Sequence, residues 1–278
     1  MNLFKNIFKN KKILATHNGS FHADDVFACA TLSLVLEKRG ENFKVIRTRD
    51  EEIIKNADYV FDVGGIYDEN LNRFDHHQKG GAGKRENGIE YSSFGLVWKK
   101  FGNEICNSEE VVKIIDDRLV APIDAFDNGF DLVENKYQIS PYFIQHFFLA
   151  MRPTLREENL TNDEMFLKSI LFAKQVLLRE ITHVEDAIFS FQKVVSVYEK
   201  TEDKRVLVLD ENFQNEESLT SLKEPLYIIY PRKDDGLWGV RAVRENPRTF
   251  NNRKDFPEKW AGLRDDELQK ITGVKDAI

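Results

Sequence analysis

The sequence has few cysteines, no long apolar run and no excess of positive charge, and each of these features argues against a class of protein. Its two cysteines, Cys29 and Cys106, form no Cys-x-x-Cys pair, so a disulfide framework and a cysteine-rich zinc site are unsupported and a reducing compartment is expected. No run reaches the ~18 consecutive apolar residues of a membrane helix. The net charge of −7 argues against broad binding along a nucleic-acid duplex but is compatible with an enzyme that grips one phosphate.

The remaining composition is that of a globular protein. The 278 residues are 41% hydrophobic and 31% charged, enough for one large domain or two of ordinary size. Residues 1–12 contain four lysines and no acid, and we expect a frayed leader there rather than an import signal. The expected location is cytoplasmic, with mitochondrial or nuclear location as alternatives for a eukaryotic source.

Hydrophobic patterning predicts an α/β N-terminal domain with a mainly parallel sheet flanked by helices. Apolar runs at residues 13–16, 43–48 and 59–63 predict strands, and the helical spacing over residues 23–39 predicts a helix that ends at Gly40. A strand, helix, strand order implies right-handed crossovers and parallel strands. Sheets of this kind bind ligands beyond the carboxyl ends of their strands.

A smaller α+β domain is predicted to follow. Further helices are expected at residues 92–101, 108–123 and about 163–198, and further strands at residues 206–209, 226–230 and 237–243. We therefore predict one domain over residues 1–200 and a smaller second domain over residues 201–278.

Two clusters of acid and histidine each adjoin an apolar run. One, residues 73–78, reads RFDHHQ, and the other, residues 17–25, reads HNGSFHADD. Either cluster alone would be interpreted as a polar loop, but two of them at strand ends favour a site. Residues 80–85 (GGAGKR) are expected to form a mobile basic loop near it.

Carboxylates that converge without cations repel one another, and divalent metals remove that repulsion. A mixed set of oxygen and imidazole ligands suits manganese, cobalt or zinc better than calcium. Two such ions about 3.5–4 Å apart activate a water and stabilise the oxyanions of phosphoryl transfer. Asp62 ends a strand and is well placed to bridge them, and His77 could protonate a leaving group. The candidate residues are His17, His22, Asp24, Asp62, Asp75, His76, His77, Asp124 and Asp127.

The C-terminal half contains a basic stretch. Residues 232–254 hold seven Lys or Arg against three acids, in a chain whose net charge is −7. A solvated charged face and a phosphate-binding surface are both compatible with this count.

These motifs resemble those of a known family. Residues 16–25 (THNGSFHADD), 62–68 (DVGGIYD) and 73–78 (RFDHHQ) are similar to the MYG family (melanocyte proliferating gene, first member) of the DHH phosphoesterase superfamily. Residues 250–254 (FNNRK) and 260–264 (WAGLR) are similar to its C-terminal region, so the resemblance covers nearly the whole chain.

The resemblance implies a two-domain DHH fold and a 3′–5′ exonuclease acting on RNA or short oligonucleotides with two divalent cations, Mn²⁺ in preference to Mg²⁺, Co²⁺ or Zn²⁺. His77 would face the scissile phosphate, and Asp75 would orient or support the site. The family's chain usually continues beyond Ile278, so we expect a C-terminal domain incomplete at its end. The residues implied as ligands are His17, His22 and Asp62 for one ion and Asp24, Asp62, His76 and Asp124 or Asp127 for the other; those implied for substrate are Arg241, Arg244 and Arg253.

Two alternatives stay open. One is hydrolysis of a small phosphate compound such as a cyclic dinucleotide or pyrophosphate, and the other is a non-catalytic protein in which a metal staples the fold. A homodimer is compatible with the sequence under each interpretation.

Overall fold

The computed structural model describes residues 11–213 and 216–278, so most of the expected N-terminal leader lies outside the described residues. The chain divides into two compact units, Met1–Val184 and Glu185–Ile278, called here the N-terminal and C-terminal units.

The division falls inside one long helix, α7 (Asn162–Lys200), earlier than the predicted domain boundary at residue 200. The physical reason is the packing of the last turns of α7. Val194 is fully buried in the core of the C-terminal unit, and Val197 and Tyr198 pack against that core. The final turns of the helix therefore fold with the strands that follow them.

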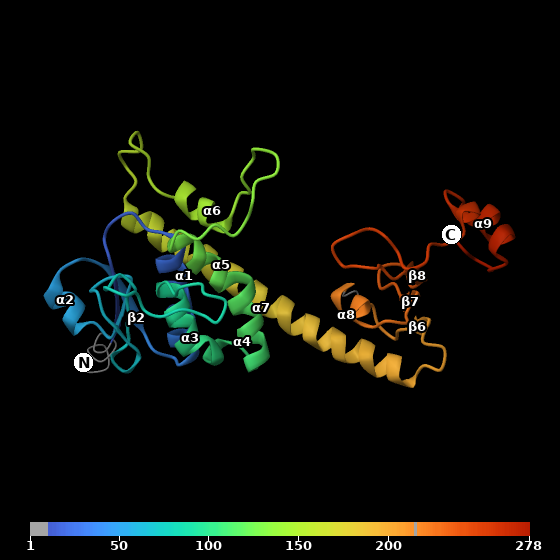
Figure 1. Cartoon of the computed structure of the whole chain (residues 1–278), viewed down its shortest axis with the longest axis horizontal. Helices are drawn as coiled ribbons and strands as arrows, with labels where there is room; N and C mark the ends of the chain where they lie inside the picture. The colour runs from blue at the N-terminus through green and yellow to red at the C-terminus, as the bar shows by residue number, and fades with distance from the viewer. Residues whose placement is uncertain (1–10, 214–215) are drawn as a thin grey trace, which may run out of the picture. The chain divides into compact units, whose positions relative to one another are not determined.

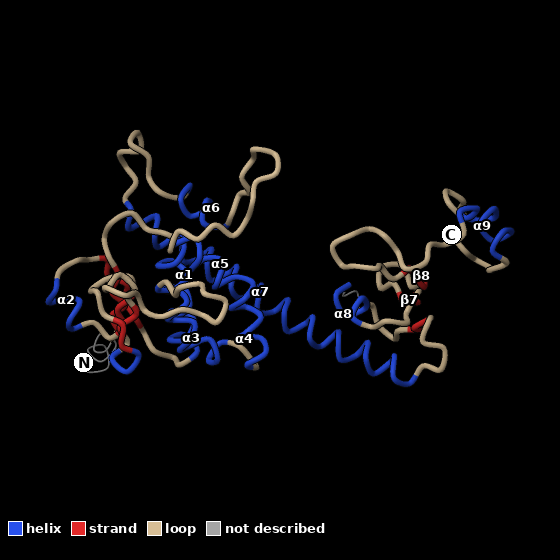
Figure 2. The backbone as a smooth tube through the Cα atoms, viewed as in Figure 1, coloured by secondary structure: helices blue, strands red, loops and turns tan. Residues whose placement is uncertain are grey.

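A five-stranded sheet forms the centre of the N-terminal unit, in the order β2-β1-β3-β5-β4. The neighbouring strands are parallel except for the edge pair β4 and β5, which is antiparallel. The prediction of a mainly parallel sheet is therefore confirmed. Figures 1 and 2 show the strands of this sheet beside the helices of the same unit. The strands are β1 (Lys12–Thr16), β2 (Phe43–Arg47), β3 (Tyr59–Phe61), β4 (Tyr67–Asp68) and β5 (Arg73–Phe74).

Helices cover both faces of this sheet because successive strand residues point to opposite sides. Tyr59 packs on Phe101 of helix α3, with ring centroids 6.0 Å apart. Val60, on the opposite face, joins a cluster that includes Ile54 of helix α2. The helices of this unit are α1 (Ala23–Lys38), α2 (Glu51–Asn56), the short 3₁₀ turn η1 (Glu69–Leu71), α3 (Ser93–Ile105), α4 (Glu109–Ile115), α5 (Ala121–Asp127) and α6 (Ile144–Ala150).

Where a single helix was expected over residues 108–123, the structure has α4 and α5 joined by a π-helical turn, η2 (Asp116–Val120). Pro122 lies in the first turn of α5, where its missing N–H costs little. Such π turns are often found at functional sites. Here the turn places Asp116 beside the buried Arg85, 2.7 Å from its guanidinium.

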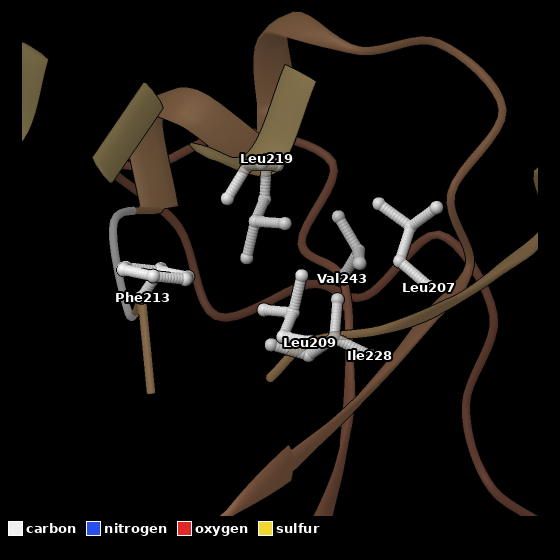
Figure 3. Close-up of a cluster of buried hydrophobic side chains, with 7 residues drawn as sticks. Leu207, Leu209, Phe213, Leu219, Ile228 and Val243 are labelled. Atoms are coloured by element: carbon white, nitrogen blue, oxygen red, sulfur yellow. The ribbon is translucent and has the colours of Figure 1, made fainter. Parts of the chain in front are cut away.

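The C-terminal unit is a small α+β fold with a three-stranded sheet in the order β6-β7-β8. Strands β6 and β7 are parallel, and β7 and β8 are antiparallel. Side chains from the strands, from α8 and from the connecting segments form its core (Figure 3). Its elements are β6 (Val206–Val208), α8 (Glu216–Ser221), β7 (Tyr227–Pro231), β8 (Trp238–Ala242), the 3₁₀ turn η3 (Glu258–Trp260) and α9 (Asp265–Thr272).

Across both described ranges, the helices are all too short or too polar to cross a bilayer.

Arg253 ties the segment after β8 to the end of α8. Its guanidinium donates hydrogen bonds to three backbone carbonyls: those of Thr220 at 2.8 Å, Leu222 at 2.5 Å and Pro225 at 3.0 Å. A cation at a helix C-terminus also interacts favourably with the helix dipole. This geometry gives Arg253 a structural role, whereas substrate contact was expected from the sequence.

We predict that Arg253→Met lowers the free energy of unfolding by about 2 kcal/mol, because three carbonyls lose a charged donor. Denaturant unfolding of the full chain, followed by circular dichroism, measures the loss. The control is Lys254→Met, an exposed neighbour for which little change is expected. Unchanged stability combined with weakened oligonucleotide binding would instead support the substrate-binding role.

Candidate metal centre

Three neighbouring parallel strands deliver the polar clusters to one edge of the sheet. His17 follows β1 and Asp62 follows β3, while residues 75–77 follow β5. Strands β1, β3 and β5 lie side by side in the sheet, so their carboxyl ends open onto the same cavity of about 930 Å³. The cavity is lined by eight of the nine candidate residues: His17, His22, Asp24, Asp62, Asp75, His76, His77 and Asp127.

Asp62 lies at the centre of this arrangement. Its backbone φ is +54°, in the left-handed region that Asp tolerates better than most residues. Its Oδ2 is 3.1 Å from His17 Nε2, and its Oδ1 is 3.4 Å from His76 Nε2. Burial opposes the charged form, but these two imidazoles outweigh it and hold the pKa of Asp62 below its ordinary value.

The donor atoms of these side chains fall into three groups. Within each group, the atoms all lie within 4.8 Å of one another. The groups share Asp62 and His22, so a common set of ligands could serve two neighbouring ions. Around an ion with ligands about 2.0–2.2 Å away, tetrahedral or octahedral geometry puts donor atoms roughly 3–3.5 Å apart. The distances from Asp62 to its two imidazoles match that spacing. The groups are His17, His22 and Asp62; Asp62, His76 and His77; and His22, Asp24 and Asp127.

Unpartnered polar atoms test whether this donor set suits a cation. Asp24 is 1% exposed, and both of its carboxylate oxygens lack a hydrogen-bond partner among the described residues. Burial, together with the nearby charges of Asp62 and Asp127, raises the pKa of Asp24 well above its ordinary value. His76 Nε2 is also buried without an aligned hydrogen bond, although Asp127 lies 3.2 Å away. Divalent cations would satisfy these atoms, so the residues fit a metal centre.

Asp75 supports His77. Its Oδ2 accepts a 2.5 Å hydrogen bond from the backbone N–H of Gly65, and its Oδ1 lies 2.8 Å from His77 Nδ1. The hydrogen bond to Asp75 raises the pKa of His77, and burial only partly opposes this. The His77 side chain is 63% exposed, so its Nε2 edge is available to a ligand in the cavity.

Two arginines hold the loop between β1 and α1. Arg47, at the end of β2, and Arg152, after α6, donate hydrogen bonds to the backbone carbonyls of Gly19 and Phe21. The Arg47 side chain is almost fully buried, and its guanidinium lies 4.8 Å from the ring centroid of Phe166. This clamp fixes the backbone that carries His17 and His22.

Asp25 was not among the sequence-predicted site residues, yet it contacts both histidines of this loop. Its Oδ1 accepts from the backbone N–H of His22 at 2.9 Å, and its Oδ2 lies 3.2 Å from His17 Nε2. Burial lowers the pKa of His17, but hydrogen bonds to Asp25 and Asp62 outweigh it and raise the pKa to about 9. The signal in the sequence was the acid three residues after the N-cap position, which is typical of a capping box.

The structure does not bring Asp124 into the cavity. Its carboxylate accepts hydrogen bonds from Arg85 Nη1 at 2.7 Å, Ser92 Oγ at 2.6 Å and the Gly95 backbone N–H at 3.0 Å. A Cβ on Gly95 would lie 1.9 Å from Asp124 Oδ2, so only glycine permits this approach. The expected mobile loop is thus anchored by Arg85, which is 8% exposed.

The substrate contacts predicted for the C-terminal unit are only partly available. Arg241 forms an ion pair with Glu216, and Arg253 binds the carbonyls described above. Arg244 lies over the ring of Phe250, with 4.8 Å between its guanidinium carbon and the ring centroid.

Proteins similar to this chain include exonucleases. A mouse protein named MYG1 exonuclease is 31% identical over 300 residues, covering 95% of this chain and 78% of the mouse protein. The human MYG1 exonuclease is 29% identical with the same coverage. A MYG1 protein of Chlamydia pneumoniae is 33% identical over 285 residues, covering 95% and 87%. The exonuclease names of these relatives support a hydrolase.

The family follows from a direct match. Residues 13–278 match the model MYG1_exonuc, described as Uncharacterised protein family (UPF0160), and the chain belongs to this family. The resemblance found in the sequence motifs is confirmed. Among solved structures, a pGpG-specific phosphodiesterase, PggH of Vibrio cholerae, covers 79% of this chain at 11% identity and a TM-score of 0.35, a likeness too distant to support an argument.

The different surroundings of Asp124 and Asp127 predict different consequences of the same substitution. Asp127→Asn removes a donor from the cavity, so we expect roughly tenfold or more weaker Mn²⁺ binding by calorimetry with little change in unfolding. Asp124→Asn leaves Arg85 with one buried partner fewer, so we expect a loss of about 3 kcal/mol in the free energy of unfolding. The opposite pattern would make Asp124 the ligand.

Proposed function

We propose that this protein is a metal-dependent phosphodiesterase that removes nucleotides from the 3′ end of RNA or short oligonucleotides. The observation that carries the proposal is the position of Asp62, shared by two groups of donor atoms at adjoining strand ends. The exonuclease names of the curated relatives support the reaction class.

The ligands divide between two cations around Asp62. His17, His22 and Asp62 would hold one ion, and Asp24, Asp62, His76 and Asp127 the other. Cations bound there supply a water of lowered pKa and positive charge for the phosphate oxygens. Asp62 would serve in both sets, since its Oδ2 lies 3.1 Å from His17 Nε2 and its Oδ1 lies 3.4 Å from His76 Nε2.

The other residues of the site orient its histidines and donate a proton to the substrate. Asp75 fixes the His77 ring through Nδ1, leaving Nε2 to donate to a phosphate oxygen or to the departing oxygen. The raised pKa of His77 favours the protonated imidazole that such donation requires. Asp25 holds His17, and through it the first ligand set.

A substrate panel tests the proposal. Purified full-length protein with Mn²⁺ should release mononucleotides from an RNA labelled at one end, and comparing 5′ and 3′ labels gives the direction of attack. Cyclic dinucleotide and pyrophosphate belong in the same panel. Preferential hydrolysis of either small compound would overturn RNA as the substrate. One tightly held ion and no hydrolysis would favour a metal that only staples the fold.

We predict that Asp62→Asn lowers the rate of hydrolysis by roughly a hundredfold or more, because both groups of ligands lose a shared carboxylate. Asparagine also tolerates the left-handed backbone at this position, so the fold should persist. The measurements are steady-state hydrolysis with Mn²⁺ and thermal melting without metal. Full activity in the Asp62→Asn protein would exclude the two-metal mechanism.

Metal binding should release protons and tighten as pH rises. The pKa of His17 is raised to about 9, so its imidazole holds a proton at neutral pH in the metal-free protein, and burial together with Asp62 shifts the pKa of Asp24 upward, toward its protonated form. A cation must displace those protons. Calorimetry in two buffers of different protonation enthalpy measures the number released, and affinity that stays constant between pH 6 and pH 8 would contradict this prediction.

A further inference from the structure

Phe250 is exposed to an unusual degree for a large aromatic residue. It is 86% exposed, and it lies at the tip of a hairpin that follows β8. Two backbone hydrogen bonds close the stem of the hairpin: Glu245 N–H to Asn251 O and Arg253 N–H to Val243 O, each 2.9 Å. The ring is therefore presented to solvent by a backbone that hydrogen bonds hold in place.

Arg244 covers this ring from the base of the hairpin. Its guanidinium carbon lies over the ring, 4.8 Å from the ring centroid, which is a cation–π contact. At 86% exposure, the ring still presents most of its surface to solvent. An aromatic ring backed by a guanidinium plane is a common surface on which proteins stack single-stranded bases.

The charge around the ring matches an anionic chain. Within the described residues, Arg244, Arg248 and Lys254 have no ion pair with an acidic group. The only acid among residues 244–254 is Glu245, and Asp255 follows directly after them. Free cations beside an exposed ring fit the backbone phosphates and the base of one polymer.

We propose that Phe250 and Arg244 form a stacking site for one base of a single-stranded nucleic acid. The proposal rests on the proposed function, since it assumes an oligonucleotide substrate. It adds that the C-terminal unit recognises the flat face of a base, with Arg248 and Lys254 contributing charge.

Binding without turnover tests the stacking site separately from hydrolysis. Full-length protein is titrated into a short fluorescein-labelled oligonucleotide in the presence of a chelator, so that failure of the metal chemistry does not affect the result. The second probe is an abasic oligonucleotide of equal length and charge. Phe250→Leu keeps an apolar side chain but removes the ring. Because the position is exposed, we expect the fold to be unchanged, and thermal melting checks this.

We expect Phe250→Leu to weaken binding of the base-containing oligonucleotide about tenfold and to leave binding of the abasic one unchanged. Phe250→Trp should restore or tighten binding. Arg244→Lys, which keeps the charge but loses the plane, should weaken only the base-dependent part. Wild-type affinity in Phe250→Leu, an equal loss on both probes, or no binding by the wild type would overturn the proposal.

Phe189→Leu is the matched control. Phe189 is 52% exposed and also has a cation over its ring, Lys193 at 5.3 Å, but Glu185 and Asp186 lie within about one helical turn. We expect its oligonucleotide binding to equal that of the wild type. A loss as large as that of Phe250→Leu would show that any exposed ring–cation pair has this effect, and would remove the case for a specific site.

Discussion

The repulsion among buried carboxylates at the strand ends is the constraint on which the rest of the N-terminal unit depends. Asp24, Asp25 and Asp62 are each at most 5% exposed and lie near one another, so their charges cannot be screened by water. The imidazole of His17 lies between Asp25 and Asp62, and that of His76 lies between Asp62 and Asp127, so the two imidazoles offset part of this cost. A fold selected only for stability would not collect these groups, and their collection is the strongest physical argument for a ligand that carries positive charge.

The sequence predicted those parts of the site whose position depends only on the direction in which the strands and helices run. The strand expected at residues 13–16 is Lys12–Thr16, and the helix expected at residues 23–39 is Ala23–Lys38. Both are buried elements with nearly continuous apolar runs, for which local pattern and tertiary burial agree. The carboxyl ends of parallel strands lie at the same edge of a sheet. The convergence of the two clusters could therefore be predicted from the sequence alone.

The choice between Asp124 and Asp127 could not be made in the same way. Three residues apart on a helix, their side chains differ in direction by only about 60°, and both fit the motif. What separates them is Arg85, which reaches Asp124 from a loop 39 residues earlier in the chain. A glycine-rich loop gives no local sign that its last residue will be buried, and the π turn that sets the angle of α5 has no sequence pattern that we recognised.

In the C-terminal unit, the count of Lys and Arg overstated the number of cations available to a phosphate, because contacts with distant residues again decide the outcome. A count along residues 232–254 weighs each cation equally, but the fold uses them differently. Arg241 is neutralised by Glu216, and Arg253 holds backbone carbonyls, so neither is free to meet a phosphate. The guanidinium of Arg244, which has no ion pair among the described residues, lies over an aromatic ring instead. A surface built in this way distinguishes a polymer with bases from a bare phosphate, because stacking requires a planar partner whereas charge alone does not.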